Sequence, residues 1–172
     1  MAAISEVSDV IGKIADGFKE EVAKCMAANK NEAVELILEQ LYSGLDGNGE
    51  HLSPTYDDDP FFEEPGRWYH RGEQYKRWKQ EITPPESGLK TSSPARPTNV
   101  PNLFITGPFY DSIKADIAGD GLEFKSSGMQ QGGEIVSKYG SQILDLNMLS
   151  RDYFVFEHLE PWLEDFYRRC GW

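Results

Sequence analysis

Apolar residues near the start of the chain recur at spacings of three and four, which places them on one face of a helix: Ile4, Val7, Ile11, Ile14, Phe18, Val22 and Cys25. The same spacing returns further on in Val34, Ile37, Leu38 and Leu41. Between the two runs, Asn29-Lys30-Asn31 either kinks one helix or lets Asn31 cap a second one before Glu32. Ser43-Gly44 is a helix stop. Residues 1–45 are therefore predicted to be helical, as one long amphipathic helix or two in sequence.

Residues 46–102 lack such a period and hold eight of the ten prolines. They also contain seven aromatic residues, and long loops rich in aromatics pack on their own domain or on a partner: Tyr56, Phe61, Phe62, Trp68, Tyr69, Tyr75 and Trp78. One short helix is predicted over residues 65–82, ending before Pro84-Pro85. The segment is otherwise expected to be a long irregular insertion.

Residues 103–149 are predicted to form a β-hairpin region. Leu103, Phe104 and Ile105 form a short apolar run. Alternating apolar residues then flank Gly119-Asp120-Gly121, which is a hairpin pattern over residues 113–126. The stretch Gly128 to Gly133 is expected to be a loop, and residues 135–146 a helical turn and a short strand.

The tail, residues 150–172, is predicted to be helical, with Ser150 as its cap and a kink or break at Pro161. Its expected buried residues are Phe154, Leu159, Trp162, Leu163 and Phe166. The whole chain is thus predicted to be a single α+β domain over residues 1–172. A long N-terminal helix and C-terminal helices pack on a small antiparallel sheet, with the aromatic insertion between them.

Charge narrows the range of functions. The chain has 17 basic and 29 acidic residues, a net charge of −12, which opposes general nucleic-acid binding. No apolar run approaches the roughly 20 residues of a membrane span, and the start lacks the pattern of a secretory signal. A cytoplasmic or particle-assembled protein is expected. Cys25 and Cys170 form no close metal or redox motif, and their number alone leaves a disulfide open.

An acidic block is followed directly by the net-positive part of the chain. The acidic residues are Asp57, Asp58, Asp59, Glu63 and Glu64. The basic residues are Arg67, Arg71, Lys76, Arg77 and Lys79. Carboxylates so close together can hold a hard cation, and His51 and His70 lie on either side. The favoured interpretation is a solvated acidic loop that meets a basic surface. No nucleophile elbow, histidine pair or phosphate loop is present, so neither an enzyme nor a cofactor is expected.

The segment 101–113, Pro-Asn-Leu-Phe-Ile-Thr-Gly-Pro-Phe-Tyr-Asp-Ser-Ile, resembles the "TG-x-L-x-x-S-I" signature of neck and tail-completion proteins of tailed bacteriophages. The order of elements is also similar: helix 4–43, Thr106-Gly107 with Ser112-Ile113, hairpin 113–126, then Tyr139-Gly140. Pro108-Phe109 stand where that family usually has leucine, and the insertion at 57–100 is longer than is typical. Gly107 lets the chain turn sharply, and Ser112 can bond to local backbone.

The resemblance implies a structural virion protein without catalysis: a neck or head–tail connector ring, or a tail-completion adaptor between portal and tail. It implies a homo-oligomeric ring in the neck or tail region of the virion, assembled in the host cytoplasm. Portal, connector or tail proteins would be its neighbours, with no membrane contact and with DNA only as passing cargo. Residues 57–64 of one copy are expected to meet residues 67–79 of the next.

Two alternatives stay open. One is a metal-dependent hydrolase that uses Asp57, Asp58, Asp59 and His70. The other is an intracellular module whose aromatic loop binds a peptide or another protein.

Overall fold

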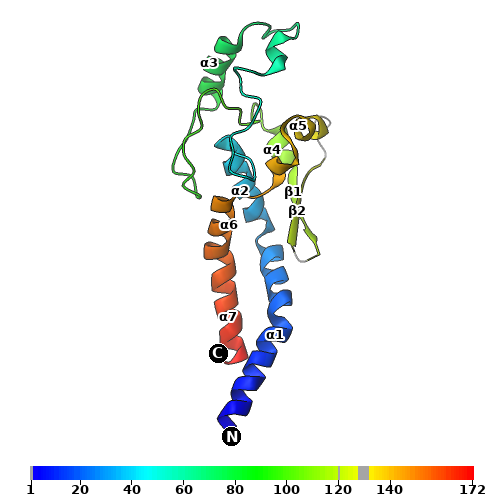
Figure 1. Cartoon of the computed structure of the whole chain (residues 1–172), viewed down its shortest axis with the longest axis vertical. Helices are drawn as coiled ribbons and strands as arrows, with labels where there is room; N and C mark the ends of the chain where they lie inside the picture. Colours follow the sequence, from blue (N-terminus) through cyan, green and yellow to red (C-terminus); the bar gives the residue numbers. More distant parts are fainter. Residues whose placement is uncertain (1, 120, 128–131) are drawn as a thin grey trace.

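The computed structural model describes residues 2–119, 121–127 and 132–172. The molecule is elongated, with a head at one end and a helical stalk at the other (Figure 1). The stalk consists of helix α1, Ala2–Ala28, and helix α7, Glu160–Cys170, which lie side by side. The N-terminal end of α1 lies at the tip of the stalk, and the shorter α7 ends before the tip, beside Val10 of α1 (Figure 1). We call the remaining elements the head.

The N-terminal segment forms two helices, as one of the two sequence alternatives predicted. Helix α1 ends at Ala28, and helix α2 spans Lys30–Tyr42. The break lies at Asn29, whose side chain donates a 2.9 Å hydrogen bond to the carbonyl of Cys25, and the prediction that Asn31 caps α2 is wrong. The stop at Ser43-Gly44 is confirmed, because Gly44 has φ = 72°, which suits glycine.

The insertion contains a 3-10 turn η1, Pro60–Glu63, and helix α3, Gly72–Ile82. Helix α3 begins seven residues later than the predicted start at residue 65, because the preceding residues form a tight reversal. The N–H of His70 donates to the carbonyl of Phe62 at 2.9 Å, and His70 itself has φ = 52°. This reversal brings α3 back beside η1.

The predicted hairpin is confirmed. Strand β1, Ile113–Ala118, pairs antiparallel with β2, Gly121–Ser126, from Ile113 opposite Ser126 to Ala118 opposite Gly121. Residue 120 of the turn lies outside the described residues. Helix α4, Pro108–Ser112, leads into β1. The run Leu103–Ile105 is not a strand, since Leu103 has the left-handed φ of 56°.

Two further sequence predictions, which concern the residues that follow the hairpin, are wrong. Helix α5, Gly132–Tyr139, is followed by a 3-10 turn η2, Ser141–Leu144, where a short strand was expected. Part of the predicted loop from Gly128 to Gly133 lies outside the described residues. Helix α6, Met148–Phe154, is capped by Asn147, whose side chain accepts the N–H of Ser150 at 3.0 Å. Ser150 is therefore inside the helix and not its cap.

One π-helical turn, η3, spans Val155–Leu159 between α6 and α7. Pro161 follows as the second residue of α7. Proline has no N–H and its ring crowds the carbonyl four residues earlier, so a wider turn just before it relieves both problems. The predicted interruption at Pro161 is thus a π-turn within a continuous helical run.

The core lies where α2, α4, the hairpin and η2 meet. Its members are Ile37, Leu41, Leu52, Val100, Phe109, Tyr110, Ile113 and Ile143. Gln40 is fully buried among them, and its amide donates to the carbonyl of Asp145 and accepts from the N–H of Asn147, both at 2.8 Å. The C-terminal helices, which follow Asn147, are thereby fixed to α2. The described chain is α+β, as predicted, with a two-stranded sheet.

Candidate functional site

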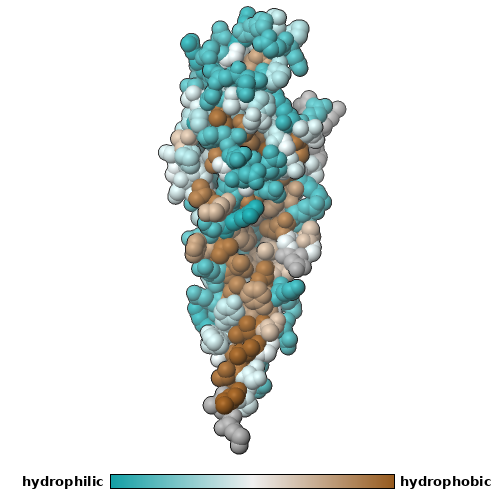
Figure 2. Space-filling view, in the orientation of Figure 1, coloured by the Kyte–Doolittle hydropathy of each residue, from teal (hydrophilic) through white to brown (hydrophobic). Residues whose placement is uncertain are grey.

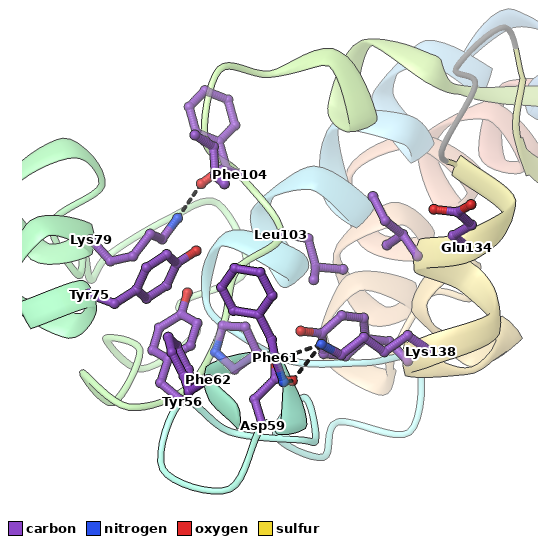
Figure 3. A pocket seen from close by; sticks show the side chains of 14 residues that line it. Tyr56, Asp59, Phe61, Phe62, Tyr75, Lys79, Leu103, Phe104, Glu134 and Lys138 are labelled. Atoms are coloured by element: carbon purple, nitrogen blue, oxygen red, sulfur yellow. Dashed lines mark hydrogen bonds and ion pairs between the residues drawn. The ribbon is translucent and has the colours of Figure 1, made fainter. Parts of the chain in front are cut away.

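The insertion and helix α5 enclose a pocket of about 440 Å³ in the head (Figure 3). Its wall is mainly aromatic and aliphatic, with charged groups at two places. The residues that matter for its chemistry are Tyr56, Asp59, Phe62, Tyr75, Lys79 and Lys138. These residues come from segments that are distant in sequence, so the pocket forms only when the head folds.

Tyr75 of α3 is the centre of the aromatic wall. Its ring lies 5.1 Å from the rings of Tyr56 and Trp68 and 5.3 Å from that of Phe62, in each case edge to face. Burial raises the pKa of Tyr75 to about 12 and raises the pKa of Tyr56 well above its ordinary value. These phenols therefore keep their protons at neutral pH, and the wall is uncharged. The aromatic insertion packs largely on itself.

The acidic cluster is distributed among separate partners. Asp59 is buried and accepts hydrogen bonds from Lys138 at 2.7 and 2.6 Å (Figure 3). Asp57 pairs with Lys76 at 2.6 Å, and that ammonium group lowers the pKa of the Asp57 carboxyl. Asp58 accepts from the N–H and hydroxyl of Thr55, both at 2.6 Å.

These separate bonds turn the three carboxylates toward different neighbours. His70 lies 3.4 Å from a different carboxylate, that of Glu63. Within residues 2–119, 121–127 and 132–172, no three histidine, cysteine, aspartate or glutamate side chains are grouped so that they could hold a metal ion. The arrangement that the hydrolase alternative needs, with Asp57, Asp58, Asp59 and His70 on one metal, is not formed by these residues.

Lys79 of α3 is 1% exposed and lines the same pocket. Its ammonium group donates to Asn102 Oδ1 at 2.9 Å and to the carbonyl of Phe104 (Figure 3). No ion pair with a carboxylate is formed by Lys79 in the described part of the chain. Burial is the main cause that lowers the pKa of Lys79 to about 7, and the nearby Arg96 adds to it.

The residues that were predicted to form an interface differ in exposure and in pairing. Glu64 and Arg71 are exposed and have no ion-pair partner within the described residues, whereas Arg67 lies over the Trp68 ring at 4.9 Å. Lys79 is buried and therefore not available to a neighbouring copy. Because α3 folds back beside η1, the acidic and basic stretches meet inside one chain at the Asp57–Lys76 pair.

The family-motif residues shape the joint between α4 and the hairpin. Gly107 precedes α4 with φ = 95°, and the Ser112 hydroxyl bonds to the carbonyl of Phe109 at 2.6 Å, as the sequence predicted. Ser112 also bonds to the hydroxyl of Ser126 at 2.7 Å, which fixes the two strand ends. Thr106 is exposed, while Tyr139 lines the pocket before Gly140, which has φ = 89°.

The stalk carries a second candidate site, which the sequence analysis missed. Ile4, Val7, Ile11 and Phe18 of α1 are 78%, 54%, 53% and 40% exposed, and we call them the apolar stripe. Figure 2 shows hydrophobic atoms running along the stalk toward its tip, with hydrophilic atoms on both sides. The spacing of these residues predicts a common face correctly, but it does not say whether the protein's own chain covers that face.

Glu21 joins the two stalk helices. Its carboxylate accepts from Arg169 at 2.8 Å and from the indole N–H of Trp162 at 3.1 Å, both in α7. Lys24 on the same helix contributes most to lowering the pKa of Glu21 to about 2. Cys25 and Cys170 are both buried free thiols.

No helix in the described part of the chain combines the length and the apolar character needed to cross a bilayer. Comparisons with protein-family models, curated proteins and solved structures give no match to this chain.

Proposed function

We propose that this protein is a structural component of a tailed-phage particle or prophage. It acts as a neck or connector ring, or as a tail-completion adaptor, between the portal and the tail. It works by assembly and not by catalysis. The proposal takes its partners to be other copies of this chain together with neighbouring portal, connector or tail proteins.

The observation that carries the proposal is the apolar stripe. Large exposed apolar patches on a folded chain mark surfaces that bind other macromolecules. Here the patch follows a long helix that extends away from the core, at the end of the molecule opposite the pocket (Figures 1 and 2). A chain with binding surfaces at its two ends suits an adaptor that joins different neighbours.

The resemblance in residues 101–113 and the order of elements around it support the same proposal. The short helix α4 joins the Thr106-Gly107 turn to the hairpin, and Tyr139, the last residue of α5, and Gly140 follow the hairpin. A binding module that recognises another protein is the second candidate, favoured by the aromatic pocket. The two differ in whether the chain assembles with itself.

Deleting the gene from the phage or prophage that encodes it tests the role in the particle. We expect filled heads and separate tails in electron micrographs, because a missing connector or adaptor leaves the two unjoined. Expression of the intact gene in trans should restore complete particles. Complete, infectious particles without the protein would contradict the proposal.

A further inference from the structure

We infer that copies of this chain assemble in parallel through their stalks, with the apolar stripe facing the axis of the bundle. The inference rests on the proposed function, since it names the surface that forms the ring. It differs from the contact expected from sequence, which lies in the head between residues 57–64 and 67–79.

The stripe is part of a seven-residue repeat. Ile4, Val7, Ile11, Ile14 and Phe18 occupy its first and fourth positions, with charged residues such as Glu6, Asp9 and Lys13 between them. Apolar residues at these positions are typical of helices that pack around copies of themselves. In α1 this repeat continues over the turns nearest the stalk tip, where exposure is greatest.

Helix α7 of the same chain covers a different side of α1. It meets α1 at Glu21 and at Gly17, where an added Cβ would lie 3.0 Å from the Phe166 ring. Beside this contact, Ile11, Ile14, Tyr167 and Trp172 line a groove of about 340 Å³. A side chain from a neighbouring stalk can enter this groove as a knob enters a hole.

Charge permits the stalks to approach one another. Helix α1 has five acidic and three basic residues, and α7 has three acidic and two basic residues. The stalk thus carries −3 of the net charge of −12, so most of the self-repulsion resides in the rest of the chain. Association through the stalks keeps the heads, which carry the remaining −9, out of the contact.

Charge along the stalk favours one direction. Asp9 is exposed in α1 and has no ion-pair partner within the described residues. Arg168, in the last turn of α7, pairs with no carboxylate of the described residues other than Glu164, at 3.3 Å. The end of α7 lies beside Val10 of α1, since an added Cβ at Gly171 would be 3.5 Å from the Val10 side chain. A parallel neighbour in register therefore brings the basic end of α7 near the level of Asp9. Parallel packing with all heads at one end is the arrangement that a closed ring requires.

Two variants test the surface. Ile11→Glu puts a carboxylate into the stripe, and Gly12→Glu adds the same charge at the next residue, where an added Cβ would meet nothing within 4 Å. In sedimentation velocity we expect Ile11→Glu to raise the concentration for half-assembly by about tenfold or more, with Gly12→Glu close to wild type. Circular dichroism of the monomers should show equal helix content, since Ile11 is 53% exposed.

The outcomes separate the inference from the proposed function. If wild type and both variants assemble equally well, the stalk inference is overturned and an assembling connector stands. If the wild type stays monomeric, both the stalk inference and the proposed function are contradicted.

The direction is tested by Val7→Cys, because parallel copies bring position 7 next to itself and mild oxidation should link pairs of chains. The native thiols are buried and should not compete. Linkage that appears only when Val7→Cys and Phe18→Cys chains are mixed would overturn the parallel arrangement, because antiparallel packing pairs fourth with first positions of the repeat.

Discussion

At the scale of single residues, the head depends on two buried cations that have no ion pair within the described residues. Lys79 and Arg96 are 1% and 2% exposed, and both donate to oxygens of uncharged groups. Lys79 ties α3 to Asn102 and Phe104, and Arg96 ties Thr83 to Val100. These bonds fix an insertion that has little regular backbone structure. In the sequence, Lys79 belongs to a run of surface-like cations, so its burial could not be predicted from composition.

Lys79→Met is expected to change how stability depends on pH. The pKa of Lys79 is lowered from 10.5 to about 7, so between pH 7 and 10.5 the unfolded chain binds more protons than the folded chain. Stability from this group therefore rises with pH, by at most about 1.4 kcal/mol per pH unit. Urea unfolding at pH 7 and pH 9 should show a rise in the wild type that is smaller in Lys79→Met. An equal rise in both proteins would contradict the assignment.

Gly107→Ala is expected to destabilise the joint before the hairpin by about 1–2 kcal/mol, because φ = 95° strains any residue with a Cβ. The space itself is adequate, since the nearest atom to an added Cβ is 3.5 Å away, on Phe104. Gly12→Ala in α1 is the matched control and should be neutral or stabilising by about 0.5–1 kcal/mol. Urea midpoints of the two variants measure this. Equal loss in both would show that backbone conformation is not the cause.

At the scale of elements, long periodic segments were predictable and short or irregular ones were not. The alternation in residues 113–126 predicted the hairpin because strand residues face opposite sides in turn. Three apolar residues at 103–105 were too short a run to show a period, and the left-handed Leu103 prevents a strand there. The cap at Asn147 was missed because Ser150 is an equally good capping residue in sequence.

The contact between α1 and α7 is expected to weaken in acid. The pKa of Glu21 is lowered from 4.5 to about 2, so the stability that it contributes is present above pH 4.5 and is lost as pH falls toward 2. In thermal unfolding, the melting temperature of the wild type should be well above that of Glu21→Gln at pH 7, and the two melting temperatures should be closer at pH 3. Glu20→Gln, at an exposed carboxylate that contacts Lys24, is the control and should differ little from wild type. A difference in melting temperature between wild type and Glu21→Gln that is the same at both pH values would contradict the role of Glu21.

At the scale of the whole molecule, the acidic and basic residues were predicted to form a contact between copies of the chain. In the structure, some of them pair with residues of their own chain instead. Distant residues such as Asp59 and Lys138 pair because the chain reverses, which no local pattern encodes. The exposed stripe was missed for a related reason, since a helix period identifies an apolar face but not what covers it. Sequence thus predicted the α+β class and the aromatic insertion, while the pocket and the stalk surface required the structure.

Native mass spectrometry of the purified chain is the most direct test of the central claim that this protein works by assembling with itself. The chain mass is 19.5 kDa. We expect one discrete species of three or more copies, because a parallel bundle with isoleucine-rich seams closes on itself. The expected mass should not change when a chelator is added. A monomer at every concentration, or a metal-bearing monomer that changes with chelator, would contradict the account.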